Sequence, residues 1–209
     1  MHNEILTAEQ VDLLPAVHLF WKDFGLVGGT AIALQIGHRE SIDFDLFTSK
    51  DFRNKTILKS IERKRYRIQK IFTDEAGQYT IVIDGVQMTF FQYDYPIGYT
   101  QNFNKIIAMP DLVTLGAMKA FELGRRAKWK DYVDLYFLLR DHVTIAQIDR
   151  KGREIFSNEY NARIFHTQLA YFEDIDYREE VVYKPGFAVD QKVIQKALLE
   201  HSLKVERLP

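Results

Sequence analysis

Two aspartates, Asp43 and Asp45, stand two residues apart in the run Ser-Ile-Asp-Phe-Asp-Leu-Phe at 41–47. Alternation along a β-strand places both carboxylates on one face and the apolar side chains on the other, Ile42, Phe44 and Leu46. Like charges on one strand face repel each other, so the pair favours a bound cation. Mg²⁺ or Mn²⁺ fits, because such ions take carboxylate and water oxygens and complete their coordination with substrate phosphates.

A glycine pair, Gly28 and Gly29, precedes this strand in Gly-Leu-Val-Gly-Gly-Thr-Ala at 25–31. Residues without Cβ let the backbone approach a phosphate, and the helix expected to start at Thr30 offers free N–H groups. Arg39, just before the aspartates, is placed to reach a phosphate as well. Asp-x-Asp alone is typical of a solvated edge and Gly-Gly alone of a simple turn, but their combination favours one site for triphosphate and metal.

A second group of charged residues lies in a pattern that is otherwise apolar. On a helical wheel Lys119 falls inside a stripe of leucines, Leu112, Leu115 and Leu123. Either its stem packs and its ammonium extends to water, or the ammonium meets nucleotide phosphates. On both interpretations the change Lys119→Met is expected to leave the fold neutral or more stable.

Asp131 and Asp134 share a helical face on a segment that is almost entirely apolar from residue 132 to 139. Buried carboxylates need partners, although acidic residues in a first helical turn are stabilising anyway. We expect Asp131 to belong to the site and Asp134 to hold a basic partner, Arg125 or Arg126.

These residues resemble a known family, the AbiEii/AbiGii-type nucleotidyltransferase toxins of the DNA polymerase β-like superfamily. The resemblance rests on Gly28-Gly29-Thr30 with Ser-Ile-Asp-Phe-Asp at 41–45, and on the block from Lys119 to residue 136. In that family the first block binds metal and nucleotide, and the Lys and Asp of the second complete the site. It therefore implies four catalytic residues, Asp43, Asp45, Lys119 and Asp131, with Lys119 also on the nucleotide.

The resemblance also implies a function: transfer of a nucleoside monophosphate from a nucleoside triphosphate to an acceptor hydroxyl. The implied acceptor is RNA, tRNA in particular, and the implied partner is a cognate antitoxin. One position departs from the superfamily pattern, because Thr89 stands where a third carboxylate is usual, and Asp94 has the wrong strand parity to replace it. Open alternatives are a one-metal enzyme, a binding module that retains the fold, and transfer to a small molecule or a protein hydroxyl.

The composition sets further bounds. The 209 residues are 46% hydrophobic with a formal net charge of −1, which predicts a folded core and argues against binding to nucleic acid by bulk charge alone. Zero cysteines agree with a reducing compartment. The sequence starts without an apolar signal segment and has no membrane-length apolar run, so we expect a cytoplasmic protein without a membrane partner.

Hydrophobic periodicity predicts an α+β fold, a polymerase-β-like mixed sheet with helices followed by a helical region. Residues 1–109 are expected to form the sheet domain, and residues 110–209 the helical region that completes the active-site cleft. A capping box at Thr7 and Gln10 opens the first helix, toward residue 23. Expected strands are 25–28, 41–47, 66–72, 79–83 and 86–93, the last two joined by an Asp84-Gly85 hairpin. Expected helices are 30–37, one from residue 51, 112–123, 132–139, 145–156, 162–171 and 191–203, with a loop at 173–184.

Overall fold

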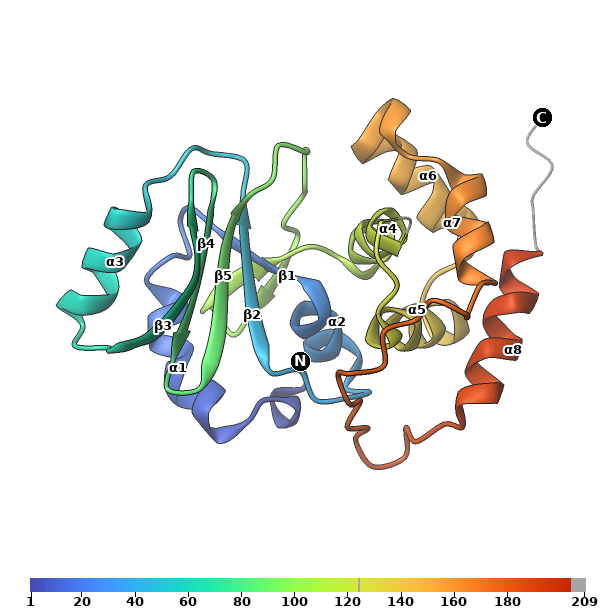
Figure 1. Cartoon of the computed structure of the whole chain (residues 1–209), viewed down its shortest axis with the longest axis horizontal. Helices are drawn as coiled ribbons and strands as arrows, with labels where there is room; N and C mark the ends of the chain where they lie inside the picture. The colour runs from blue at the N-terminus through green and yellow to red at the C-terminus, as the bar shows by residue number, and fades with distance from the viewer. Residues whose placement is uncertain (124, 204–209) are drawn as a thin grey trace. The chain divides into compact units, whose positions relative to one another are not determined.

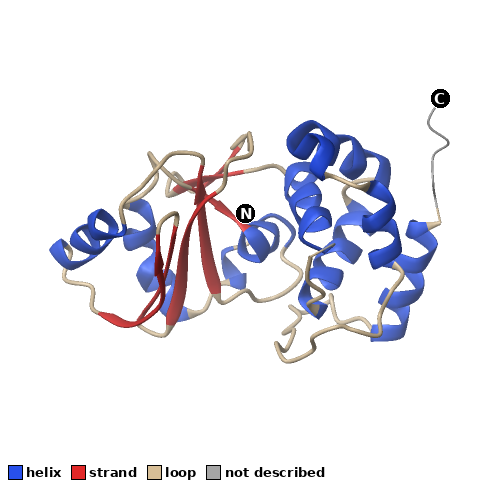
Figure 2. Cartoon of the chain, turned by 45° about the horizontal axis from the view of Figure 1, so that its top comes forward, coloured by secondary structure: helices blue, strands red, loops and turns tan. Residues whose placement is uncertain are grey.

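The computed structural model describes residues 1–123 and 125–203. It divides into two compact units, Met1–Asp111 and Leu112–Pro209. The first unit holds the strands, and the second consists of helices and loops (Figure 2). The α+β class predicted from the sequence is confirmed.

The first unit is built on a five-stranded mixed sheet of order β1-β2-β5-β4-β3. β2 runs parallel to β5, and the other neighbouring strands are antiparallel. A short β6–β7 pair lies outside this sheet. The elements are η1 (Asn3–Ile5), α1 (Ala8–His18), β1 (Gly25–Val27), α2 (Gly28–Ile36), β2 (Asp43–Thr48), α3 (Asn54–Arg63), β3 (Ile68–Glu75), β4 (Gln78–Ile83), β5 (Val86–Gln92), β6 (Gln101–Phe103) and β7 (Ile107–Met109).

One face of the sheet is the hydrophobic core of this unit. Alternate residues of β2 and its neighbours are fully buried there: Phe44, Leu46, Ile81, Met88 and Phe90. The rings of Phe20 and Phe24, which follow α1, contact Phe90 at centroid distances of 4.8 and 5.3 Å. Figure 1 shows α1 and α3 on this side of the sheet. Because the pleat alternates, the opposite face receives Asp43 and Asp45.

The start of β2 differs from the expectation. The strand begins at Asp43, so Ile42 lies outside it and is 62% exposed, whereas Ser41 is buried. The prediction that Ile42 shares the apolar face was therefore wrong. The reason is a hydrogen bond that the alternation pattern does not encode, from the hydroxyl of Thr30 to that of Ser41 at 2.8 Å.

The structure contains the helix cap and the hairpin that short sequence motifs predicted. The capping box of Thr7 and Gln10 is present, and Asp84 and Gly85 have φ angles of 49° and 81°, as a tight hairpin requires. The first helix ends at His18 rather than near residue 23, because the chain turns there to bring Phe20 into the core. The helix expected from residue 51 begins at Asn54.

The second unit is a set of helices around an aromatic core. The predicted bounds of α4 and α6 are reproduced, whereas α5 begins three residues before the expected start. Phe121 and Phe156 stack at 3.9 Å between centroids, and they join α4 to α6. The elements are α4 (Leu112–Leu123), α5 (Trp129–Asp141), α6 (Ile145–Phe156), η2 (Ser157–Glu159), α7 (Ala162–Leu169) and α8 (Gln191–Ser202).

The loop predicted at 173–184 is anchored by charge. Glu179 pairs with the ammonium groups of both Lys128 and Lys130 at the start of α5. Burial alone would raise the pKa of Glu179, but the hydrogen bonds from the two lysines outweigh it and lower the pKa to about 2. Asp176 adds backbone hydrogen bonds to the same segment. The loop therefore holds the chain that leads into α5.

A close approach in the first unit gives a stability test. A Cβ added at Gly25 would lie 2.0 Å from the ring of Tyr99, whose hydroxyl donates to the carbonyl of Phe47 at 3.1 Å. We expect Gly25→Ala to displace Tyr99 and to lower the free energy of unfolding by about 1–3 kcal/mol. Gly98→Ala is the matched control, because a Cβ there meets nothing within 4 Å. Denaturant unfolding with equal losses for both variants would contradict this assignment.

Candidate active site

The first sequence block folds into one cluster in the first unit. Gly28 follows β1 directly, with φ of +70°, and starts α2. A Cβ at this position would lie 2.4 Å from Oδ2 of Asp45, since Val27 and Asp45 are paired across β1 and β2. Glycine is therefore required at residue 28 twice, for its backbone angle and for the space that the carboxylate occupies.

Gly29 has a similar relation to Arg39. A Cβ at residue 29 would lie 2.3 Å from a terminal nitrogen of the Arg39 guanidinium. That side chain is only 4% exposed, and its other terminal nitrogen donates to the carbonyl of Glu40 at 2.8 Å. A guanidinium on the first turn of a helix adds to the positive end of the helix dipole. Together they attract an anion.

The backbone at the start of α2 is suited to such an anion. The N-cap residue of this helix is Val27, whose side chain makes no capping hydrogen bond. Uncapped N–H groups at a helix start are ready hydrogen-bond donors for phosphate. An uncapped start is ordinary by itself, since α3 and α5 share it. The guanidinium of Arg39 over Gly29 is what distinguishes α2.

Thr30 has a positioning role that sequence reasoning missed. Its side chain is buried, and its hydroxyl lies in hydrogen-bonding distance of the Ser41 hydroxyl and of the Asp43 carbonyl oxygen. These contacts tie the first turn of α2 to the start of β2. Asp43 is therefore held in place through its backbone, while its carboxylate stays on the polar face. In the sequence, the only sign of this positioning role is the presence of small hydroxyl residues near the aspartates.

The two aspartates fit a hard divalent cation. Asp43 and Asp45 are both partly exposed on the same strand face, and each offers carboxylate oxygens. In the part of the chain that is described, no group of three His, Cys, Asp or Glu side chains is arranged to hold a metal. Mg²⁺ commonly binds through one or two carboxylates and completes its octahedron with water and substrate phosphates. Two carboxylates beside an anion-attracting helix start meet that requirement.

The strand register shows what stands beside the carboxylates. Thr89 on β5 is the partner of Asp45 in the parallel pairing, so the two side chains share a face. Asp94 lies beyond the end of β5, where it accepts a hydrogen bond from Gln92 at 3.1 Å. The position next to Asp45 thus carries a hydroxyl.

The second block folds into a buried charge cluster in the second unit. The ammonium of Lys119 on α4 is hydrogen-bonded to Asp131 and lies 3.1 Å from Oδ2 of Asp134, both on α5. All three side chains are at most 8% exposed. Lys119 therefore neither extends to water nor sits unpaired among leucines. These contacts change the expectation for Lys119→Met, because loss of this charge would leave buried carboxylates without their cation.

The arginines nearby also differ from the expectation. Arg126 lies 3.7 Å from Asp131 and 3.9 Å from Glu122, and Arg125 pairs with Glu159 at 3.6 Å. Asp134 has a basic partner, as predicted, but the partner found is Lys119 of α4 and not one of the arginines suggested as examples. Among the described residues, Oδ2 of Asp131 is buried without a hydrogen bond. Arg126 offsets its charge from just beyond hydrogen-bonding distance.

Comparison with known proteins identifies the first unit. A family model described as nucleotidyl transferase AbiEii toxin, of a type IV toxin–antitoxin system, matches residues 16–107. This range contains the whole cluster from Gly28 to Asp45. The chain belongs to the AbiEii nucleotidyltransferase toxin family. Lys119 and Asp131 lie beyond the matched residues.

Other known proteins are similar to this chain in sequence or in fold. The uncharacterized protein aq_aa25 of Aquifex aeolicus strain VF5 is 33% identical over 164 residues, which are 76% of this chain and 77% of the relative. MenT4, a nucleotidyltransferase toxin from Mycobacterium tuberculosis H37Rv, has a similar structure with a TM-score of 0.62 at 12% identity, covering 96% of this chain and 87% of MenT4. JHP933 from Helicobacter pylori reaches 0.55 at 15% identity, covering 94% and 91%. These structures share the nucleotidyltransferase fold.

The family assigns the protein to the transferases. None of the described helices has the length and apolar character needed to cross a membrane.

The buried cluster predicts that Lys119→Met destabilises the fold, which is opposite to the expectation from the sequence. Lys119→Met leaves two buried carboxylates without their cation, so we expect it to cost about 3–5 kcal/mol of unfolding free energy. Lys151→Met is the control on α6, because Lys151 forms a surface pair with Glu154 worth less than about 1 kcal/mol. Urea unfolding followed by circular dichroism measures both. A Lys119→Met protein as stable as the wild type would contradict the role of Lys119 as the cation of this cluster.

Proposed function

We propose that this protein transfers a nucleoside monophosphate from a nucleoside triphosphate to a hydroxyl of RNA, with tRNA as the acceptor class. It would act in the cytoplasm as the toxin of a toxin–antitoxin pair and be neutralised by a cognate antitoxin. The observation that carries the proposal is the carboxylate of Asp45 packed against Gly28 at the uncapped start of α2. Family membership supports the transferase chemistry.

Each residue of the cluster has a proposed task. The backbone N–H groups of Gly28, Gly29 and Thr30 bind the triphosphate, because the helix start directs them outward and glycine leaves room. The guanidinium of Arg39 neutralises phosphate charge. Asp43 and Asp45 hold the divalent metal.

The transfer reaction requires few protein groups that take part in bond making or breaking. The acceptor oxygen forms a bond to the α-phosphorus, the bond from that phosphorus to the pyrophosphate oxygen breaks, and the acceptor proton is released. A bound Mg²⁺ or Mn²⁺ would supply Lewis-acid stabilisation of the phosphate charge. Asp45 is aligned through Val27 and Thr89, and Asp43 through Thr30, so the protein contributes mainly positioning and electrostatics.

Lys119 and Asp131 enter the proposal from the family resemblance. Lys119 would stabilise phosphate charge, and Asp131 would hold its ammonium in place. The hydrogen bond between the two supports the second task. Their contribution is separable from stability if kcat/KM is measured at a temperature at which both wild type and variant are folded.

A second candidate function is a nucleotide-binding or partner-binding module without transfer activity. Thr89 favours it, because a hydroxyl stands beside Asp45 where the superfamily usually has a third carboxylate. Incubation with each α-labelled nucleoside triphosphate, Mg²⁺ and total RNA separates the two. Label on RNA supports the proposal, whereas saturable nucleotide binding without transfer supports the module. Label on the protein or on a small molecule would reassign the acceptor.

Neutralising either carboxylate tests the metal role. We expect Asp43→Asn and Asp45→Asn each to lower transfer by about 10² or more, the size typical for one preorganised electrostatic group, with little change in stability. Asp84→Asn is the control, since Asp84 lies in the exposed β4–β5 turn. If the loss of activity followed the loss of folded protein in all variants, the catalytic assignment would be withdrawn.

Metal addition gives a readout that does not depend on activity. Without Mg²⁺ the two carboxylates repel each other, so both Asn variants should melt no lower than the wild type. Addition of Mg²⁺ with nucleotide should raise the melting temperature of the wild type more than that of the variants, because ligands stabilise the state that binds them. Equal shifts in all three proteins would place the metal elsewhere.

A further inference from the structure

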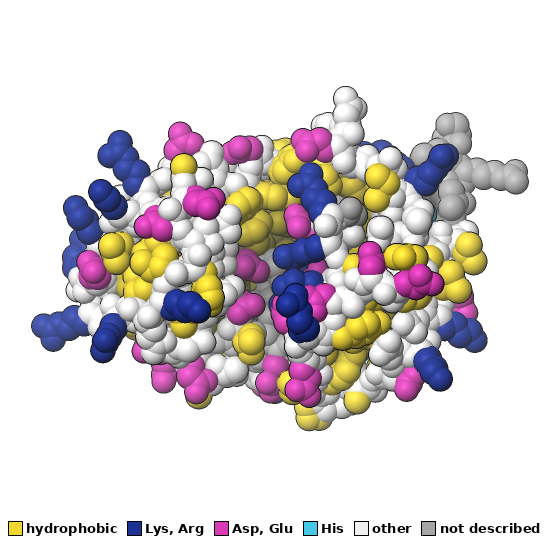
Figure 3. Space-filling view, in the orientation of Figure 1, with side chains coloured by type: hydrophobic (Ala, Val, Ile, Leu, Met, Phe, Trp, Pro, Cys, Tyr) yellow, Lys and Arg dark blue, Asp and Glu magenta, His cyan; other side chains and the backbone are white. Residues whose placement is uncertain are grey.

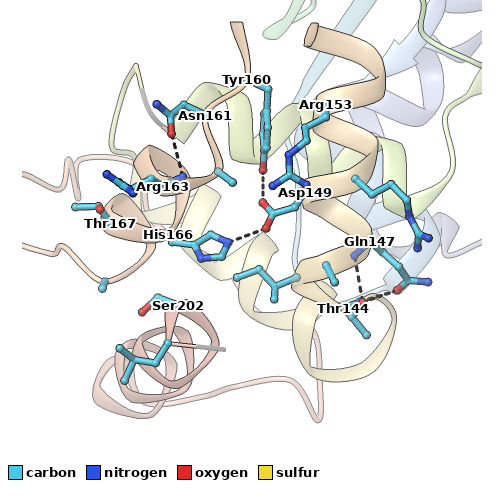
Figure 4. Close-up of a pocket in the computed structure, with 16 residues that line it drawn as sticks. Thr144, Gln147, Asp149, Arg153, Tyr160, Asn161, Arg163, His166, Thr167 and Ser202 are labelled. Atoms are coloured by element: carbon cyan, nitrogen blue, oxygen red, sulfur yellow. Dashed lines mark hydrogen bonds and ion pairs between the residues drawn. The ribbon is translucent and has the colours of Figure 1, made fainter. Parts of the chain in front are cut away.

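The second unit contains a large cavity that the transfer chemistry does not use. It has a volume of about 1270 Å³ and lies among α6, α7 and the end of α8. Its wall includes three arginines, Arg150 and Arg153 from α6 and Arg163 from α7. Figure 4 labels Arg153 and Arg163. Pockets for small ligands usually measure about 300–1,000 Å³, so this one has room for a segment of a polymer.

Hydrogen bonds hold several side chains of the cavity wall in place. The hydroxyl of Tyr160 donates to Asp149 Oδ1 at 2.8 Å, and His166 Nε2 lies 2.9 Å from Asp149 Oδ2. Burial, then the negative charge of Asp149, raises the pKa of Tyr160, so this hydroxyl stays a donor. Figure 4 shows the Tyr160 and His166 side chains converging on Asp149. Both carboxylate oxygens of the acidic residue are thus engaged by the wall itself.

The arginines are the groups left for a ligand. All three are exposed, and within the described residues none of them forms an ion pair. The helix starts at the cavity offer no alternative, because Thr144 caps α6 and Asn161 caps α7. A cluster of guanidinium groups favours phosphate or carboxylate oxygens, which their planar forks bind in pairs.

The shape of the wall favours the backbone of a nucleic acid over its bases. Base stacking needs an open aromatic face, but the ring of Tyr160 is buried against α6, where a Cβ at Gly152 would lie 2.5 Å from it. Phosphates carry one charge per nucleotide and need only cations at intervals along a groove.

We propose that this cavity binds the phosphate backbone of a single RNA strand through Arg150, Arg153 and Arg163. The inference rests on the proposed function in one respect, that the strand is the acceptor. Two other runs of basic residues are less suited to this role. The arginines at 125 and 126 are used in ion pairs, whereas the run at 63–65 belongs to the first unit, where Lys and Arg side chains project around α3 (Figure 3).

The test is a binding measurement without nucleotide or metal. We expect the triple change Arg150→Gln, Arg153→Gln and Arg163→Gln to weaken binding of a fluorescent 20-nucleotide single-stranded RNA about tenfold or more. The slope of log K against log salt should fall in magnitude by about 2, since each lost phosphate contact on a single strand accounts for about 0.7. The control removes three exposed lysines that do not line the cavity: Lys55→Gln, Lys59→Gln and Lys192→Gln.

The outcomes separate this inference from the proposed function. If the arginine variant is folded and binds the RNA like the lysine control, the inference is overturned, even if transfer activity is confirmed. If poly-glutamate binds the wild type as tightly as the RNA and depends on the same arginines, the ligand class is wrong. Loss of RNA binding in the arginine variant alone supports the inference, even in a protein that transfers no nucleotide.

Discussion

The arrangement of the first unit depends on one contact, the carboxylate of Asp45 against the backbone of Gly28. A side chain at residue 28 would need the same space. Because glycine is there, β1 can pass into α2 without a connecting loop, and the helix start lies beside the aspartate on the neighbouring strand. The groups proposed to bind phosphate and metal are thus positioned by two adjacent strands and by the turn between one of them and a helix, which are rigid elements.

The second unit contains a different kind of charge cluster. Lys119 faces two buried aspartates, so the cluster carries a formal excess of one negative charge that Arg126 only partly offsets. A buried ion pair contributes little net stability over an apolar substitute, yet removing one partner is costly. The cluster therefore specifies how α4 packs against α5 more than it stabilises the fold. Such an arrangement is compatible with catalysis, because a lysine that must stabilise phosphate charge needs a fixed ammonium.

Sequence patterns predicted what is local and missed what is not. Period-two alternation placed Phe44 inside and Asp45 outside, and the short motifs at Thr7 and Asp84 gave a cap and a hairpin, because each depends on residues within four positions. The error at Ile42 concerns the start of β2, because the strand begins only at Asp43. Ser41 is instead hydrogen-bonded to Thr30, eleven residues earlier in the chain. A helical wheel cannot show a partner on another helix.

The same limit applies to Lys119 and to the cavity. The wheel showed the leucines around Lys119 but not Asp134, fifteen positions further on. Arg150 and Arg163 are separated by a helix end and a 3₁₀ turn, so no window of the sequence brings them together. Thr89 is the instructive exception, since comparison with the superfamily pattern pointed to this position, and the strand register places it beside Asp45.

The way a helix starts indicates whether its first turn serves the fold or binds a ligand. Four of the described helices begin with a side chain that accepts hydrogen bonds from one or two backbone N–H groups of the first turn: Thr7, Thr144, Asn161 and Asp190. α2 begins with two glycines and a buried guanidinium in place of a cap. Glycine costs helix stability, and a cation at a helix N-terminus is unfavourable, so this start breaks two local rules at once. A bound anion would accept hydrogen bonds from this helix start and interact favourably with the guanidinium, which is the expected signature of a site organised around its ligand rather than around the fold.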